Sequence, residues 1–319
     1  MILPPALLVA GPTASGKSAL ALDLAERLNG TIINADSMQV YAELRVLTAR
    51  PTPQEEARVP HRLYGIRPAA QPGSAAWWRN EALAAMDEAR EKHRLPILTG
   101  GTGLYFAALT QGLSDIPDPG PSARAEARAL LAELGAAALH ARLAAEDPVT
   151  AARVNPNDSQ RIARAWEVWR GTGTGLAAWQ AQIATSAPAP AWHFTAILLD
   201  PPREALRAAI ATRFQAMLRQ GAIDEVKVLL AQHLDSALPA MRAHGVPELS
   251  AYLRGEIALE EAGRRTELVT GQYTKRQATW FRHHPLAPRT HTIHARYAGL
   301  TQFSERKMTE LVSFVRSTG

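Results

Sequence analysis

Apolar and polar positions follow one another along the first third of the chain in a pattern typical of an α/β protein. Short apolar runs at 2–10, 31–35 and 95–99 predict buried strands. Segments rich in Ala and Leu at 18–28 and 75–93 have the apolar spacing of helices. Strands that alternate with helices indicate a parallel sheet wound in βαβ units and flanked by helices.

The pattern changes in the middle of the chain. The segment 115–121 is rich in Pro and Asp and predicts a stiff linker. Helical spacing then returns at 122–146 and at 156–170, where Asn157 or Asp158 is the expected N-cap. These segments, with a further helix through Trp179, predict an all-helical insertion.

Beyond the insertion the strand pattern returns once. The apolar run 194–199 predicts a strand that rejoins the sheet, and the chain reads as helical from Arg203 almost to its end. We therefore expect an α/β core formed by 1–117 and 191–319, with the helical insertion at 118–190.

The turn between the first strand and the first helix carries a complete phosphate-loop motif. It consists of Gly11, Pro12, Thr13, Ala14, Ser15, Gly16, Lys17 and Ser18. The glycines let the backbone curl so that its N–H groups point at phosphate oxygens, and the helix N-terminus adds positive charge. Lys17 can reach the terminal phosphates and the Ser18 hydroxyl can bind Mg²⁺. The alternative, a turn that binds nothing, does not explain the full motif in its proper strand–helix setting.

Two more candidate groups follow predicted strands. Asp36 and Ser37 follow the second strand, and Gly100–Thr102 follows the third. Because ligands bind at the carboxyl ends of parallel strands, both groups are expected to converge with the phosphate loop. Asp36 is the better candidate for a functional carboxylate, although an Asp-Ser pair after a strand is often only a cap. Asp200 also follows an apolar run, but the prolines after it favour a helix N-cap.

Composition narrows the classes of function. The 319 residues contain no Cys, which excludes disulfides, thiolate catalysis and Cys-based zinc sites. No signal peptide and no membrane-spanning stretch are evident, so we expect a cytoplasmic enzyme. The formal charge is +5, and Arg-rich segments at 161–170, 264–265 and 275–282 are candidates for binding nucleic-acid phosphates. The alternative for each segment is a solvated helix face.

A series of motifs resembles the tRNA dimethylallyltransferase family, also called tRNA isopentenyltransferases. After the phosphate loop, the matching segments occur in the family's order at 36–41, 48–52, 59–61, 100–105, 155–162, 221–226 and 273–282. The resemblance spans almost the whole chain. It implies a fold like that of P-loop NTPases, and transfer of a dimethylallyl group from dimethylallyl diphosphate to N6 of adenosine 37 in tRNAs that read codons beginning with U. It also implies Mg²⁺ as cofactor, tRNA as partner, and a monomer of bacterial type.

The chemistry assigns roles to individual residues. Asp36 is placed to accept the proton of the exocyclic amine, while Lys17, the loop N–H groups and Mg²⁺ on Ser18 stabilise the departing diphosphate. Thr13 and Thr102 can orient the diphosphate or the amine. The resemblance implies that Arg213 contacts the diphosphate. The residues predicted to contact tRNA are Asp36, Ser37, Met38, Gln39, Thr102, Arg124, Gln160, Arg161, Arg164, Lys275, Arg276, Gln277 and Arg282.

The target base must leave the anticodon loop to reach this chemistry, so an aromatic side chain could stack on it. Tyr273 and Trp280 are the candidates, with packing in the core as the alternative for both. Three positions depart from the family pattern: Leu47 replaces Gly, Arg62 replaces His and Val246 replaces Tyr; in addition, Arg50 replaces Lys.

Three rival functions share some of these features. A small-molecule or nucleoside kinase uses the same phosphate loop, but it would show ATP-dependent phosphoryl transfer. An adenylate isopentenyltransferase, which prenylates free adenine nucleotides, would not need the insertion or the basic C-terminal segment. A non-catalytic RNA-binding protein would not need intact Lys17, Ser18 and Asp36.

Overall fold

The computed structural model describes residues 3–114, 116–186, 191–299 and 304–317. The chain divides into two compact units, the first formed by 1–110 and 190–319 and the second by 111–189. The sequence placed these boundaries at 117/118 and 190/191. The linker residues that follow helix α4 (Gly103–Thr110) therefore group with the helical unit.

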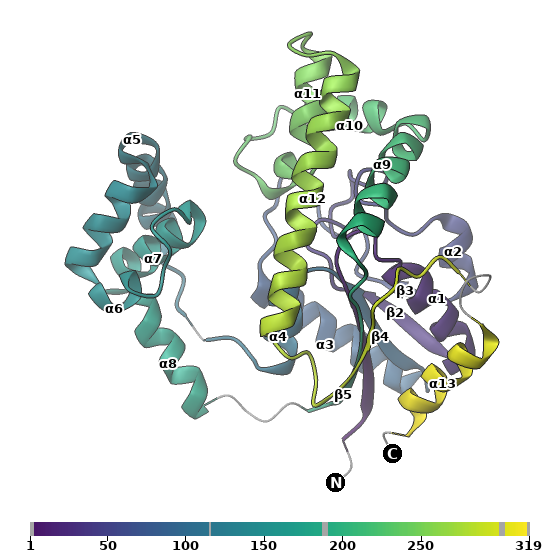
Figure 1. Ribbon diagram of the computed structural model, residues 1–319. Coiled ribbons are helices and arrows are strands. Elements are labelled where there is room, and N and C mark those ends of the chain that lie inside the picture. Colours follow the sequence, from purple (N-terminus) through teal and green to yellow (C-terminus); the bar gives the residue numbers. More distant parts are fainter. Residues whose placement is uncertain (1–2, 115, 187–190, 300–303, 318–319) are drawn as a thin grey trace. The chain divides into compact units, whose positions relative to one another are not determined.

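The first unit is built on a six-stranded parallel sheet with the order β3-β2-β4-β1-β5-β6 (Figure 1). Its strands are β1 (Pro5–Ala10), β2 (Gly30–Asn34), β3 (His61–Arg62), β4 (Leu95–Gly100), β5 (His193–Leu199) and β6 (Arg289–Ile293). The four predicted strands are confirmed, and so is the P-loop-like α/β fold. The first begins at Pro5, later than expected, because consecutive prolines lack the N–H groups that a ladder needs.

Alternate residues of the central strands bury on opposite faces of the sheet. Leu7 and Val9 pack with α1 (Lys17–Leu28) and α13 (Glu305–Arg316). Leu8 and Ala10 lie in a second core with α3 (Ala75–Glu91), α4 (Gly103–Thr110) and the helices that follow β5. Each fully buried Leu or Val contributes roughly 1.5–3 kcal/mol. The sheet is therefore held rigidly between two apolar layers, and its carboxyl ends carry the site.

The segment after β5 is mostly helical, as expected. It contains α9 (Arg203–Arg219), α10 (Ala222–Leu230), a 3₁₀ turn η1 (Pro239–Arg242), α11 (Val246–Leu253) and α12 (Leu259–His283). The buried face of α12 is polar, with Thr266, Thr270, Thr274 and Gln277. A helix with this inner face is suited to holding loops by hydrogen bonds.

Two expectations about this segment are wrong. The chain is not helical to its end: β6 forms at the sheet edge, where three of its five side chains are exposed and polar, so no apolar run marks it. Asp200 is not a helix N-cap, because α9 begins after Pro202 without a side-chain cap. Asp200 instead faces His294, with 3.9 Å between Oδ2 and Nδ1.

Two short elements between β2 and α3 were also not predicted. Helix α2 (Pro53–Arg58) begins with a capping box, in which Thr52 and Glu55 bond each other's backbone N–H groups. Strand β3 follows it and pairs with β2. Both elements are too short to produce a periodic pattern.

The second unit is entirely helical. It contains α5 (Gly120–Glu146), α6 (Pro148–Ala151), α7 (Ser159–Thr172) and α8 (Leu176–Ser186). Gly135 interrupts α5 with a positive φ of 76°. Asp158 is the N-cap of α7, since its side chain accepts a hydrogen bond from the N–H of Arg161. The core of this unit includes Leu139, Leu143 and Ile162.

In the described part of the chain, no helix combines the length and the apolar character that crossing a membrane requires.

Candidate active site

The phosphate loop connects β1 to α1 and depends on both of its glycines. A Cβ at Gly11 would lie 2.8 Å from the carbonyl oxygen of Leu199 on the neighbouring strand. Gly16 has a φ of 90°, and a Cβ there would meet the backbone of Tyr297. Ala14 is also left-handed, with a φ of 67°. This backbone forms a tight turn, closed by a 3.1 Å hydrogen bond from the N–H of Ser15 to the carbonyl of Pro12.

Lys17 lies at the end of this loop, near the charged side chains of Asp36 and Arg213. Its Nζ donates a 3.4 Å hydrogen bond to the carbonyl of Pro12. Burial lowers the pKa of Lys17 to about 8; the charge of Asp36 partly opposes this effect and that of Arg213 adds to it. An anionic ligand would restore the full charge, so this lysine is prepared to bind phosphate.

Asp36 is fixed by the residues around it at the end of β2. Its backbone N–H bonds the Oδ1 of Asn34 at 2.8 Å, and its own Oδ1 accepts a 2.9 Å hydrogen bond from the N–H of Met38. Asn34 is fully buried and also donates to the carbonyls of Asp36 and Leu63. The carboxylate is therefore held in one orientation, with part of its acceptor capacity left for a substrate.

The ends of β2 and β4 meet beside this carboxylate. Thr102 Oγ1 accepts a 3.0 Å hydrogen bond from the N–H of Ser37 and lies 3.3 Å from the Ser37 hydroxyl. The negative charge of Asp36 influences the pKa values of Lys17 and Arg213, so both cations lie near it. Arg213 reaches the site from α9, and burial lowers its pKa. The strand ends converge, as the sheet pattern predicted.

Two of the residues predicted to contact tRNA hold loops in place. Gln277 is 4% exposed; it accepts a hydrogen bond from the N–H of Thr13 and donates one to the carbonyl of Gly101. Gln39 is 9% exposed and donates to the carbonyls of Thr48 and Ala49. The structure gives both amides a positioning role, and their contact with tRNA stays a prediction.

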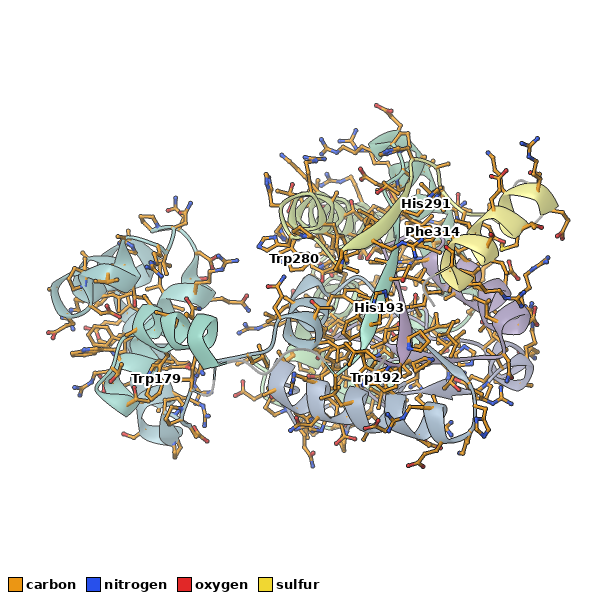
Figure 2. All side chains as sticks on the ribbon, turned by 90° about the horizontal axis from the view of Figure 1, so that it is seen from below. Trp179, Trp192, His193, Trp280, His291 and Phe314 are labelled. Atoms are coloured by element: carbon orange, nitrogen blue, oxygen red, sulfur yellow. The ribbon has the colours of Figure 1, made fainter. Side chains whose placement is uncertain are left out.

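The aromatic side chains of α12 differ in their surroundings. Trp280 extends from α12 (Figure 2). It stacks on His284 with 4.4 Å between ring centroids, and a Cβ at Gly103 would lie 2.2 Å from its ring. These contacts favour a packing role for Trp280. Tyr273 is half-buried near Asp36, and burial raises its pKa to about 12. Tyr273 is therefore the better placed of the two to meet a base beside Asp36.

The side chain of His244 packs beside Tyr273. Its ring meets the Tyr273 ring edge-on, with centroids 5.0 Å apart. Burial and the charge of Arg276 lower the pKa of His244, which the charge of Asp36 opposes. The side chain is therefore neutral near pH 7. Nothing in the sequence pattern pointed to it.

Of the basic residues predicted to bind tRNA, Arg161, Lys275, Arg276 and Arg282 are exposed, and Arg124 and Arg164 are partly exposed. Lys275, Arg276 and Arg282 lie on the outer face of α12 in the first unit. Within the second unit Arg124 pairs with Asp118, Arg161 with Asp158 and Arg164 with Glu167, at 2.5–3.3 Å, and Gln160 is also exposed. Exposed pairs of this kind contribute about 0–1 kcal/mol, so phosphates can replace their carboxylates. Their assignment to tRNA stays a prediction.

The residues near Ser18 fit a magnesium ion. Ser18 and Thr99 line the same pocket of about 60 Å³. The Thr99 hydroxyl is buried and has no hydrogen-bond partner among the described residues. Mg²⁺ prefers oxygen ligands and keeps several waters. A hydroxyl at the loop and an unsatisfied hydroxyl in the same pocket suit such an ion, and diphosphate and water would supply the remaining ligands.

Comparison with known proteins agrees with this geometry. The sequence model of the family described as IPP transferase matches residues 39–284. The chain belongs to this family. The tRNA dimethylallyltransferase of Granulibacter bethesdensis is 64% identical to it over 98% of both chains, and that of Gluconobacter oxydans is 57% identical over 97% of this chain and 93% of the relative.

A solved structure of the IPP transferase family supports the same conclusion. The tRNA isopentenylpyrophosphate transferase of Bacillus halodurans is 32% identical, with a TM-score of 0.68 over 98% of this chain and 96% of that chain. The similarity in fold thus supports the same family assignment as the similarity in sequence.

The structure accounts for the positions that depart from the family's usual motifs. Leu47 and Val246 belong to one apolar core, and the Leu47 side chain would lie 2.8 Å from a Cβ at Gly245. The larger Leu47, in place of the usual Gly, therefore lies in the same apolar region as the smaller Val246, in place of the usual Tyr. Arg62 pairs with Glu88 at 2.8 Å on the edge strand. Arg50 donates to the backbone carbonyl of Ala42 at 3.2 Å.

Proposed function

We propose that the protein transfers a dimethylallyl group from dimethylallyl diphosphate to N6 of adenosine 37 in tRNAs that read codons beginning with U. The observation that carries the proposal is the position of Asp36. This oriented carboxylate lies beside the phosphate loop, and its charge influences the pKa values of Lys17 in the loop and Arg213 on α9. A proton acceptor and a diphosphate site in one cleft suit attack by an amine on an allylic diphosphate.

The leaving group requires stabilisation by positive charge. As the bond between C1 and oxygen breaks, the electron pair goes to the diphosphate, and Lys17, Arg213 and the loop N–H groups neutralise it. Mg²⁺ on Ser18, with Thr99 nearby, would supply further charge at the diphosphate oxygens when bound. Preorganised cations of this kind lower the barrier most where charge develops.

The nucleophile requires a base. The N6 amine of adenine forms the new bond to C1 and must lose a proton, which passes to Asp36. The N–H of Met38 holds the carboxylate for this step, and Asn34 holds the backbone of Asp36. Thr102 and Ser37 at the neighbouring strand end are placed to orient the amine, and the half-buried Tyr273 is placed to contact the base.

Further features belong to the same proposal. The tRNA is bound through its anticodon stem-loop by exposed basic residues of both units. The enzyme works as a monomer in the cytoplasm and requires Mg²⁺. Its relatives' names specify tRNA as the substrate, and the basic faces of α12 and α7 support this for the present chain.

One assay separates the proposed function from its rivals. The protein is incubated with Mg²⁺ and radiolabelled dimethylallyl diphosphate, and with either an anticodon stem-loop that contains A37, the same stem-loop with G37, or AMP. We expect label only in the A37 stem-loop. Label in AMP would support a free-nucleotide prenyltransferase. A parallel incubation with labelled ATP and a nucleoside tests the kinase: phosphate transfer there, without prenyl transfer in the first assay, would support it.

A further inference from the structure

A segment near the C-terminus covers the phosphate loop. Residues 294–299 follow β6, and the N–H of Tyr297 donates a 2.9 Å hydrogen bond to the carbonyl of Ser15. The backbone of Tyr297 also lies against Gly16, where a Cβ would come within 1.9 Å of its carbonyl oxygen. We call residues 294–299 the covering segment. The matched part of the family model ends at residue 284, before this segment begins.

The covering segment is anchored at Tyr297. This side chain is 1% exposed, and its hydroxyl donates a 2.5 Å hydrogen bond to Oδ2 of Asp23 on α1. The backbone bond to Ser15 and the side-chain bond to Asp23 fix the segment on both sides of the loop. A residue next to Tyr297 is therefore held at a defined place over the phosphate site.

Arg296 occupies that place. Its Nε donates a 2.9 Å hydrogen bond to the carbonyl of Ala14, a residue of the phosphate loop. The side chain is exposed, and no carboxylate in the described part of the chain forms an ion pair with it. By contrast, Arg264 on α12 pairs with Glu261, and Arg306 on α13 pairs with Glu310. Arg296 thus places an unneutralised guanidinium at the mouth of the loop.

The positive charge of Arg296 has an electrostatic effect at the diphosphate site. It contributes to the lowered pKa of Arg213, whose main cause is burial. Arg213 in turn contributes to the lowered pKa of Lys17. Neighbouring cations repel one another, which lowers their pKa values and destabilises their charged forms until an anion binds between them. A diphosphate is such an anion, and guanidinium groups bind its oxygens in a bidentate manner.

We propose that Arg296 is a further diphosphate-binding residue, which the covering segment holds over the phosphate loop so that it contacts the leaving group of the substrate. The proposal rests on the proposed function, since it assigns a residue to that site. The Nε–Ala14 bond holds the guanidinium beside the loop and leaves its remaining N–H groups to bind phosphate oxygens. Because the charge of the diphosphate grows as the C–O bond breaks, Arg296 stabilises the products and the transition state more than the substrate.

The test measures binding of inorganic diphosphate by calorimetry without tRNA, and steady-state kinetics with dimethylallyl diphosphate. Arg296→Ala and Arg296→Gln should weaken diphosphate binding by about 10- to 100-fold, the usual effect of losing a charged hydrogen-bond partner. Arg296→Lys should retain most of the affinity. Gln can still donate to the carbonyl of Ala14 but carries no charge. If Arg296 only braces the loop, Arg296→Gln will bind diphosphate as the unmodified protein does, and the proposal is wrong.

Two further variants make the outcome specific. Arg306→Ala, on α13 and paired with Glu310, removes an exposed arginine outside the site and should leave diphosphate affinity unchanged. Lys17→Ala should lose diphosphate affinity if the proposed function is right. If Lys17→Ala loses it while the Arg296 variants retain it, the role of Arg296 is refuted and the proposed function stands. If Lys17→Ala also retains it, the diphosphate site itself is misassigned and both proposals fall.

Discussion

The side-chain carbonyl of Gln277 accepts a 2.8 Å hydrogen bond from the N–H of Thr13, so helix α12 is tied directly to the phosphate loop. The amide nitrogen of the same side chain donates to the carbonyl of Gly101 at 2.9 Å. One buried glutamine therefore sets the distance between the loop after β1 and the loop after β4. The helix that carries Lys275 and Arg276 on its outer face holds the diphosphate site on its inner face.

We predict that Gln277→Ala and Gln277→Glu disturb the diphosphate site while leaving tRNA binding intact. Loss of either hydrogen bond displaces the two loops, and small displacements of this kind reduce turnover by about 10²-fold. The Michaelis constant for dimethylallyl diphosphate should rise, and the dissociation constant for tRNA should stay within about threefold. Gln272→Ala, an exposed glutamine of the same helix, is the matched control. A collapse of tRNA affinity with normal diphosphate kinetics would instead assign Gln277 to the tRNA interface.

Asp36→Asn should lower turnover by roughly 10²–10⁴-fold, the usual contribution of a positioned base. Because the Asn side chain can still accept the hydrogen bond from the N–H of Met38, the local backbone should not change. Binding of diphosphate and of tRNA should therefore stay close to that of the unmodified protein. Single-turnover rates with saturating substrates make the comparison. Turnover within a few-fold of normal would remove Asp36 from the mechanism.

The lowered pKa of Lys17 predicts a pH dependence of diphosphate binding. The protonated amine binds the anion, and this form is lost as pH rises through about 8, whereas an ordinary lysine keeps its charge until about 10.5. Affinity for inorganic diphosphate should thus fall between pH 8 and pH 9.5 by up to about tenfold per pH unit. Calorimetry across this range measures it. Lys17→Arg stays charged and should bind without that fall, although more weakly, and an equal fall in this variant would exclude Lys17 as its source.

Much of this site could be predicted from the sequence because its parts are local. The phosphate loop is a continuous motif between an apolar strand and a helix, and Asp36 directly follows a buried strand. The role of Gln277 could not be predicted, since its partner Thr13 lies 264 residues away. Arg296 follows the polar edge strand β6, which has no apolar run to mark it. Long-range hydrogen bonds and exposed edge strands leave little trace in local patterns.

Neutralising basic residues of α7 and α12 should weaken tRNA binding without changing diphosphate binding. Alanine at Arg161, Arg164, Lys275 or Arg276 removes a positive charge without altering the diphosphate pocket. Where the residue contacts a phosphate, tRNA affinity should fall and its dependence on salt should flatten by somewhat under one unit of slope. Fluorescence titration at several salt concentrations measures both, with Arg254→Ala as the control, since Arg254 is exposed and paired with Glu256. Unchanged slopes in all four variants would show that these faces are only solvated.

Mapping the modified nucleotide tests the central claim most directly. The modification forms only if the phosphate loop binds dimethylallyl diphosphate, Asp36 accepts the proton and the tRNA is bound correctly. Purified protein is incubated with Mg²⁺, dimethylallyl diphosphate and an unmodified tRNA that reads codons beginning with U, and the RNA is digested and analysed by mass spectrometry. We predict one dimethylallyl group on N6 of adenosine 37, and none when Lys17→Ala replaces the normal protein. A modification at another nucleotide, or unmodified tRNA under conditions in which dimethylallyl diphosphate binds, would contradict the account.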